Sequence, residues 1–137
     1  MQRDWEIVEE TREWIARARE DLELARYALT AQNPFISPAL FHAQQAAEKA
    51  LEAFLTWHSV LFCKTHSIEE LGEQCLQVDQ SMAGTIDRAT PLTEYAWRFR
   101  YPGAPFSPSL EDAKYAIVLA EEVLDVVLTR LPKEVTD

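Results

Sequence analysis

The stretch SPALFHAQQAAEKALEAFLTWHS, residues 37–59, decides the fold. It contains no glycine, and no proline follows Pro38, so nothing interrupts a helix along its length. Ser37 is a good helix N-cap, and proline at the first helical position loses no hydrogen bond. Apolar residues recur every three or four positions, the period of a helix with one buried face. That face contains Leu40, Ala43, Ala47, Leu51 and Phe54, with Trp57 or His58 at its end.

The segments on both sides of this stretch also have helical patterns. Residues from about 9 to 31 predict a helix that ends at Asn33-Pro34, because the residue before a proline is disfavoured in the α region. Its buried face contains Trp14, Ala18, Leu22, Ala25 and Leu29. Alanines at 43, 46, 47, 50 and 53 make the central helix narrow, so we expect another helix to pack closely against it.

Two later helices begin at capping boxes. Ser67 is followed by Glu70, and Ser109 by Asp112, which places a carboxylate three residues after a hydroxyl. Between them, residues from about 82 to 98 predict a weaker helix that Thr90-Pro91 kinks or splits. The last residues, 132–137, are expected to be frayed.

The composition excludes several fold classes. Only 3 glycines occur in 137 residues, too few for the many tight turns of a β-rich fold. No strand pattern, internal repeat or low-complexity tract competes with the helices. We therefore predict one domain, residues 1–137, that forms an all-α, antiparallel up-and-down bundle of four to five helices, three of them long.

Charge and cysteine content limit the function. With 23 acidic and 13 basic residues the net charge is −10, which repels nucleic acid unless a local basic cluster binds it. Cys63 and Cys75 have neither the spacing nor the histidine neighbours of a metal site, so we expect two reduced thiols and no metal or other cofactor. No apolar segment predicts a signal peptide or a membrane span, and we expect a cytoplasmic protein.

Four stretches together resemble a known family. They are residues 18–25 (AREDLELA), 41–55 (FHAQQAAEKALEAFL), 65–71 (THSIEEL) and 100–103 (RYPG), and the second is the most specific. In this order and at this spacing they resemble the HEPN domain family, over about residues 9–130. The resemblance implies a helical bundle that is usually dimeric and often encoded beside a small nucleotidyltransferase.

The resemblance leaves the activity open. Some HEPN proteins are metal-independent endoribonuclease toxins, with an arginine followed a few residues later by a histidine. Others act as nucleotide-binding or partner-binding modules. The histidines here are His42, His58 and His66, and none follows an arginine closely, because Arg26 lies sixteen residues before His42 across a predicted helix break. We therefore assign no catalytic residue.

The residues of the central helix include a polar stripe. His42, Gln45 and Lys49 recur at i, i+3 and i+7, so their side chains share one helix face. Such a stripe on an alanine-rich helix is typical of an anion pocket or a subunit seam. A solvated helix face has the same pattern, and the sequence does not distinguish them.

A second set of candidates lies outside the long helices. Arg98, Arg100 and Tyr101 precede a proline-rich loop and offer guanidinium groups for phosphate and a ring for stacking. The alternative is that the arginines pair with carboxylates, such as Asp21 or Glu94. His66, beside the Ser67 cap, fits either a ligand contact or a structural tether of the turn.

These observations favour a non-catalytic HEPN-like module. We expect it to form a homodimer, to act with a separate nucleotidyltransferase subunit as in a toxin–antitoxin pair, and to bind a nucleotide or that partner. The alternatives are a metal-independent endoribonuclease toxin with an atypical site, acting on RNA through Arg98 or Arg100 with Tyr101 or His42, and a purely structural adaptor.

Overall fold

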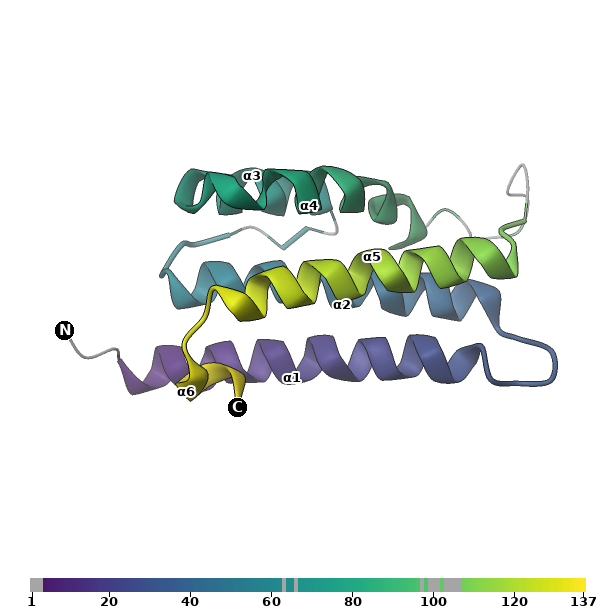
Figure 1. Ribbon diagram of the computed structural model, residues 1–137, viewed down its shortest axis with the longest axis horizontal. Coiled ribbons are helices and arrows are strands. Elements are labelled where there is room, and N and C mark those ends of the chain that lie inside the picture. The colour runs from purple at the N-terminus through teal and green to yellow at the C-terminus, as the bar shows by residue number, and fades with distance from the viewer. Residues whose placement is uncertain (1–3, 63, 66, 97, 99–101, 103–106) are drawn as a thin grey trace.

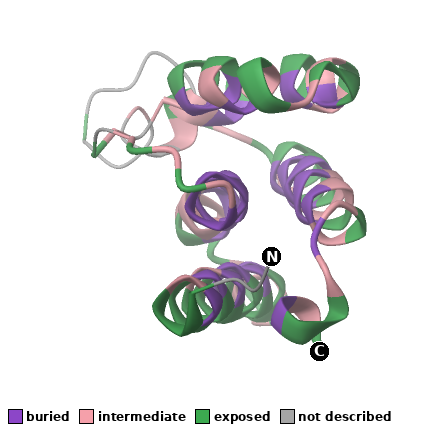
Figure 2. Ribbon diagram, turned by 90° about the vertical axis from the view of Figure 1, so that its left-hand side faces the viewer, coloured by how far each residue is buried: buried purple, intermediate pink, exposed green. Residues whose placement is uncertain are grey.

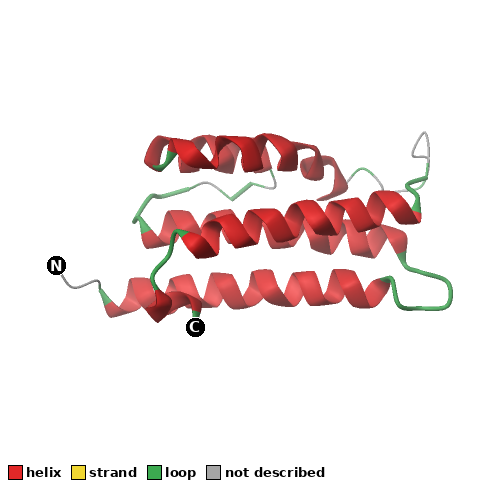
Figure 3. Cartoon of the chain, in the orientation of Figure 1, coloured by secondary structure: helices red, strands yellow, loops and turns green. Residues whose placement is uncertain are grey.

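The described part of the chain is built entirely of helices and loops (Figure 3). A computed structural model describes residues 4–62, 64–65, 67–96, 98, 102 and 107–137. The helices are α1 (Trp5–Ala28), α2 (Ile36–Trp57), α3 (Ile68–Val78), η1 (Gln80–Met82), α4 (Ala83–Ala89), η2 (Thr90–Ala96), α5 (Leu110–Thr129) and α6 (Lys133–Thr136). The predicted all-α fold with three long helices is therefore confirmed. No helix among these residues is long and apolar enough to cross a membrane.

The three long helices lie side by side, with α3 and α4 above them and the short α6 below, against α1 (Figure 1). The chain turns back after α1, so α1 and α2 are antiparallel. The layer of α3, α4 and η2 returns the chain to the end where α2 begins, and α5 then runs alongside α2. Helix α2 thus contacts α1, α5 and the upper layer, and it forms the centre of the bundle.

The core follows from the small side chains of α2. All five of its predicted alanines, at 43, 46, 47, 50 and 53, are completely buried. Between residues 39 and 57 only Phe41, His42, Gln45 and Lys49 are not classed as buried. A helix with buried residues on almost every side is enclosed by its neighbours, as Figure 2 shows for the inward-facing sides of the bundle. The predicted close approach of other helices to α2 agrees with this packing.

The helix ends agree with the predicted caps at two of three positions. Ser109 and Asp112 form the full capping box, and the Ser67 hydroxyl accepts a hydrogen bond from the Glu70 backbone N–H at 3.1 Å. The predicted Ser37 cap is wrong, because α2 begins at Ile36 and its N-cap, Phe35, makes no side-chain hydrogen bond. The Phe35 N–H instead donates to the Ala28 carbonyl at 2.9 Å, so the turn after α1 brings the chain into helix earlier.

The C-terminal helix corrects the expectation of a frayed tail. Leu131 and Val135 are buried, and α6 lies against the N-terminal half of α1 (Figure 1). The Arg12 side chain donates to the Glu134 carbonyl at 2.6 Å, and Arg19 donates to the Thr136 carbonyl at 3.1 Å. The predicted break at Thr90-Pro91 is confirmed, since α4 ends at Ala89 and η2 follows.

Gly72 sets how closely α3 approaches α4. A β-carbon built at Gly72 would overlap the Ile86 side chain, whereas one at Gly84 meets only Arg88 Nη1, at 3.5 Å. We expect Gly72→Ala to lower the free energy of unfolding by about 1–3 kcal/mol through overpacking. Gly84→Ala, the matched control, should be neutral or stabilising by up to about 1 kcal/mol. Urea denaturation of both variants checks this, and equal effects would contradict it.

Candidate functional site

The accessible strip of α2 is the polar stripe singled out in the sequence. Its side chains, His42, Gln45 and Lys49, lie on one face and are half-buried. The side chains of His42 and Lys49 are 29% and 24% exposed. Apart from Phe41, the rest of α2 between residues 39 and 57 is enclosed. A ligand or partner therefore reaches this part of the central helix along the strip.

A buried carboxylate on α1 joins two residues of the stripe. Asp21 is 6% exposed, and its two oxygens lie 2.8 Å from His42 Nδ1 and 2.6 Å from Lys49 Nζ. A buried charge is stable only when it is paired in this way. Since an ionised carboxylate only accepts hydrogen bonds, His42 Nδ1 carries the proton and donates. When the ring is neutral, Nε2 therefore holds the lone pair.

The role of Asp21 was not found from the sequence, which considered it only as a partner for arginine. The position of Asp21 in the sequence gives one indication that its charge is paired. Asp21 lies next to Leu22 and three residues after Ala18, at the edge of the apolar face of α1, where an unpaired charge is costly. Its partners are 21 and 28 residues away, and no local pattern indicates them.

Further along α2, a buried cluster of amides surrounds a second carboxylate. Glu48 Oε2 accepts hydrogen bonds from the side-chain amides of Gln44 at 3.0 Å and Gln45 at 3.1 Å. Gln45 also donates to Gln44 Oε1 at 2.7 Å. Glu48 is 7% exposed, and these donors satisfy its buried carboxylate oxygen.

A third carboxylate, that of Glu52, follows Glu48 by one helical turn. Glu52 is 6% exposed, and burial raises its pKa to about 7. The negative charge of Glu48 also raises this pKa, whereas the Lys49 ammonium opposes the increase. The side chain therefore changes charge near neutral pH, unlike an exposed glutamate.

A groove of about 250 Å³ opens beside the stripe, between α1 and α2. Its lining residues are Glu10, Glu13, Trp14, Arg17 and Lys49. The Trp14 ring contacts Phe62 edge-on, with ring centroids 6.2 Å apart, and its buried Nε1 has no hydrogen-bond partner in the described structure. Arg17 makes only a long, exposed ion pair with Glu13, at 3.4 Å. The groove thus combines two cations, an aromatic ring and a buried donor.

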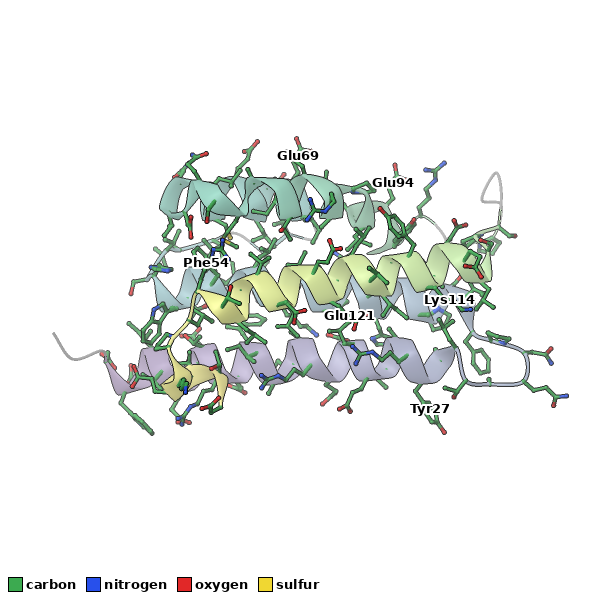
Figure 4. All side chains as sticks on the ribbon, viewed as in Figure 1. Tyr27, Phe54, Glu69, Glu94, Lys114 and Glu121 are labelled. Atoms are coloured by element: carbon green, nitrogen blue, oxygen red, sulfur yellow. The ribbon has the colours of Figure 1, made fainter. Side chains whose placement is uncertain are left out.

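Of the second set of candidates, the structure describes Arg98, which is not among the residues that line this groove. Arg98 pairs with Glu94, with Nη1 2.6 Å from Oε2, and its backbone N–H donates to the Glu94 carbonyl at 2.7 Å. The carboxylate partner considered for Arg98 is therefore the one observed, and Glu94 is on η2, away from α1 (Figure 4). Arg100, Tyr101 and His66 lie outside the described residues.

Within the described structure, His, Cys, Asp and Glu side chains form no group of three that could hold a metal ion. Cys75 is a free, buried thiol, and burial raises its pKa to about 12. A thiol in this state is a poor nucleophile. Cys63 lies outside the described residues.

Comparison with known proteins agrees with this bundle. The family model described as "HEPN domain" matches residues 11–131, nearly the whole chain. The chain belongs to the HEPN domain family. The resemblance seen in the sequence is thereby confirmed.

Two similar proteins match most of the chain. The crystal structure of ST0689, described as an archaeal HEPN homologue, superposes with a TM-score of 0.70 at 31% identity, covering 95% of this chain and 98% of that one. A protein of Methanocaldococcus jannaschii named "Putative toxin MJ1304" is 28% identical over 129 residues, covering 83% of each chain. The family model covers most of α1 and all of α2, the helices that form the groove.

The Asp21 pairings should contribute to stability. Asp21→Asn removes the negative charge that Lys49 and His42 share in a half-buried place. We expect the free energy of unfolding at pH 7 to fall by about 1–3 kcal/mol. Glu13→Gln breaks an exposed pair whose side chains are 68% and 61% exposed, and it should change stability by less than about 0.5 kcal/mol. Denaturant titration of both variants provides the test, which fails if Asp21→Asn is as mild as its control.

Glu52 should make stability depend on pH. Between about pH 4.5, the ordinary pKa of a glutamate, and about pH 7, native Glu52 keeps a proton that the unfolded chain has released. Its contribution to stability therefore falls as pH rises through this interval and stays low above it. We expect Glu52→Gln to be more stable than wild type by about 1–3 kcal/mol at pH 8, with little difference at pH 5. Melting curves at both pH values measure this, and a gap independent of pH would contradict it.

Proposed function

We propose that this chain is a HEPN-family binding module of a cytoplasmic toxin–antitoxin-like pair. It binds a nucleotide through the groove between α1 and α2 and acts with a separate small nucleotidyltransferase subunit. The observation that carries the proposal is the accessible strip of the central helix, where buried Asp21 holds Lys49 and His42 beside Trp14 and Arg17.

The chemistry of the groove supports a nucleotide as ligand. Ammonium and guanidinium groups bind phosphate, and an indole ring stacks on a base. Glu10 and Glu13 carry negative charge in the same groove, so it suits a small ligand with both donors and phosphate better than a long polyanion. The net charge of −10 supports the same preference.

The relatives support the toxin–antitoxin context. The relative from Methanocaldococcus jannaschii has the word toxin in its name. This chain has no arginine closely followed by a histidine. A chain that resembles a protein named as a toxin, but has no arginine closely followed by a histidine, is suited to binding a partner. Homodimerisation and the nucleotidyltransferase partner follow from the family resemblance. Light scattering of the purified protein, alone and mixed with a small nucleotidyltransferase as candidate partner, tests both.

Nucleotide binding should stabilise the native protein. We expect ATP without metal to raise the melting temperature, because a ligand selective for the native state must do so. Lys49→Ala should weaken affinity about tenfold or more, the loss of one charge-assisted hydrogen bond. Lys114→Ala is the control, since Lys114 is an exposed lysine on α5 that pairs loosely with Glu111 (Figure 4). No shift with ATP or ADP, with a well-folded dimer, would favour a structural adaptor.

One observation favours a second candidate, a metal-independent ribonuclease. Asp21 binds Nδ1 of the half-buried His42, so Nε2 of that ring can act as a general base. Lys49 binds the other oxygen of the same Asp21 carboxylate. Incubation with RNA and a chelator distinguishes the two functions. Cleavage that is lost in His42→Ala would establish the ribonuclease, and intact RNA would leave the binding module.

A further inference from the structure

The buried carboxylates of Glu48 and Glu52 cannot both keep their charge at low cost. They are one turn apart on α2, and both are less than one-tenth exposed. Glu48 accepts two amide hydrogen bonds, from Gln44 and Gln45, whereas Glu52 accepts none within the described structure. Negative charge is therefore best placed on Glu48, and a proton on Glu52.

The groups that act on Glu52 are few. Glu48 and Lys49, on its own helix, are the charges that influence it, with opposite signs. The facing charges of α1 are Asp21, which Lys49 already binds, and the groove residues Glu10, Glu13 and Arg17. Among the carboxylates on the other neighbours of α2, Glu121 and Glu122 on α5 pair with Arg26 and Arg88, and Glu94 on η2 pairs with Arg98. Exposed to solvent are Glu69, Glu70 and Glu73 on α3 and Glu111, Asp112 and Asp125 on α5.

Lys49 connects this carboxylate pair to the groove. Its ammonium lines the groove and acts on Glu52 three residues further along the same helix. An anion bound at Lys49 shares the ammonium with Glu52 and repels the Glu52 carboxylate. Protonation of Glu52 removes that repulsion. The neutral Glu52 also no longer competes for the Lys49 ammonium, which then attracts the bound anion more strongly.

We infer that anion binding beside Lys49 is coupled to the uptake of a proton by Glu52. This inference rests on the proposed function, because it concerns the same groove. The coupling is reciprocal: the anion favours protonated Glu52, and protonated Glu52 favours the anion. The groove thus binds its ligand more tightly as the surroundings become more acidic.

The coupling operates near neutral pH, because Glu52 changes charge there. Each unit by which a bound anion raises the pKa of Glu52 corresponds to a tenfold difference in affinity between its protonated and charged forms. We expect affinity to fall about three- to tenfold between pH 6 and pH 8.

The experiment is titration calorimetry of the full chain with adenosine 3′,5′-cyclic monophosphate. Its phosphodiester has one negative charge that does not titrate between pH 6 and pH 8. Titrations at pH 7 in PIPES and in Tris, whose ionisation enthalpies differ, measure the protons taken up by wild type without any substitution. Glu52→Gln should bind at all pH values with the same affinity and take up no proton.

Two further variants separate Glu52 from other groups. Glu122→Gln removes a carboxylate of α5 that pairs with Arg88 outside the groove, and it should retain both binding and proton uptake. His42→Asn should also retain it if Glu52 is the acceptor. Uptake that persists in Glu52→Gln but disappears in His42→Asn would overturn the inference in favour of His42.

The remaining outcomes are also decisive. Binding without proton uptake in wild type would overturn the coupling and leave the nucleotide-binding proposal intact. No binding of cyclic nucleotide, ATP or ADP at any pH between 6 and 8, by protein shown to be folded, would overturn both proposals.

Discussion

The enclosure of helix α2 is the constraint on which the rest of the structure depends. A helix can be surrounded by α1, α5 and the α3–α4 layer only when its side chains are small enough for the neighbouring backbones to approach. The five buried alanines meet this requirement, and Leu40, Leu51 and Phe54 fill the remaining volume. Little surface of α2 then remains for function, and it lies in one strip.

Polar groups inside such a helix have to be paired within the bundle. Gln44, Glu48 and Glu52 are all buried on α2, where an apolar residue would pack at lower cost. Gln44 and Glu48 are hydrogen-bonded to each other and to Gln45 of the strip that reaches the surface. Asp21 on α1 pairs with His42 and Lys49 of the same strip. Buried polar groups that lower stability and adjoin an accessible groove are typical of sites retained for binding rather than for folding.

Most of the bundle could be predicted from local sequence. Apolar periodicity gave the three long helices, and serine–carboxylate pairs marked the starts of α3 and α5, because capping involves residues only three apart. The start of α2 could not be predicted from Ser37, since a main-chain hydrogen bond between Phe35 and Ala28 determines the turn. Helix α6 is too short to show a period, and burial of Val135 depends on distant α1.

The candidate site was predicted only in part. His42, Gln45 and Lys49 share a face because of helical spacing alone, so their alignment was visible in the sequence. Asp21, Trp14 and Arg17 join them through the packing of α1 against α2, which no local pattern encodes. The ligand roles of His66, Arg100 and Tyr101 stay predictions.

The contacts of α6 with α1 have a consequence for how the protein is made. Arg12 and Arg19 on α1 bind carbonyl groups of Glu134 and Thr136 on α6, which follow them by 122 and 117 residues. Such contacts close the longest loop in the fold and form late. During translation this side of α1 stays uncovered until α6 has left the ribosome, so it is open to chaperones while the residues between the two helices are made.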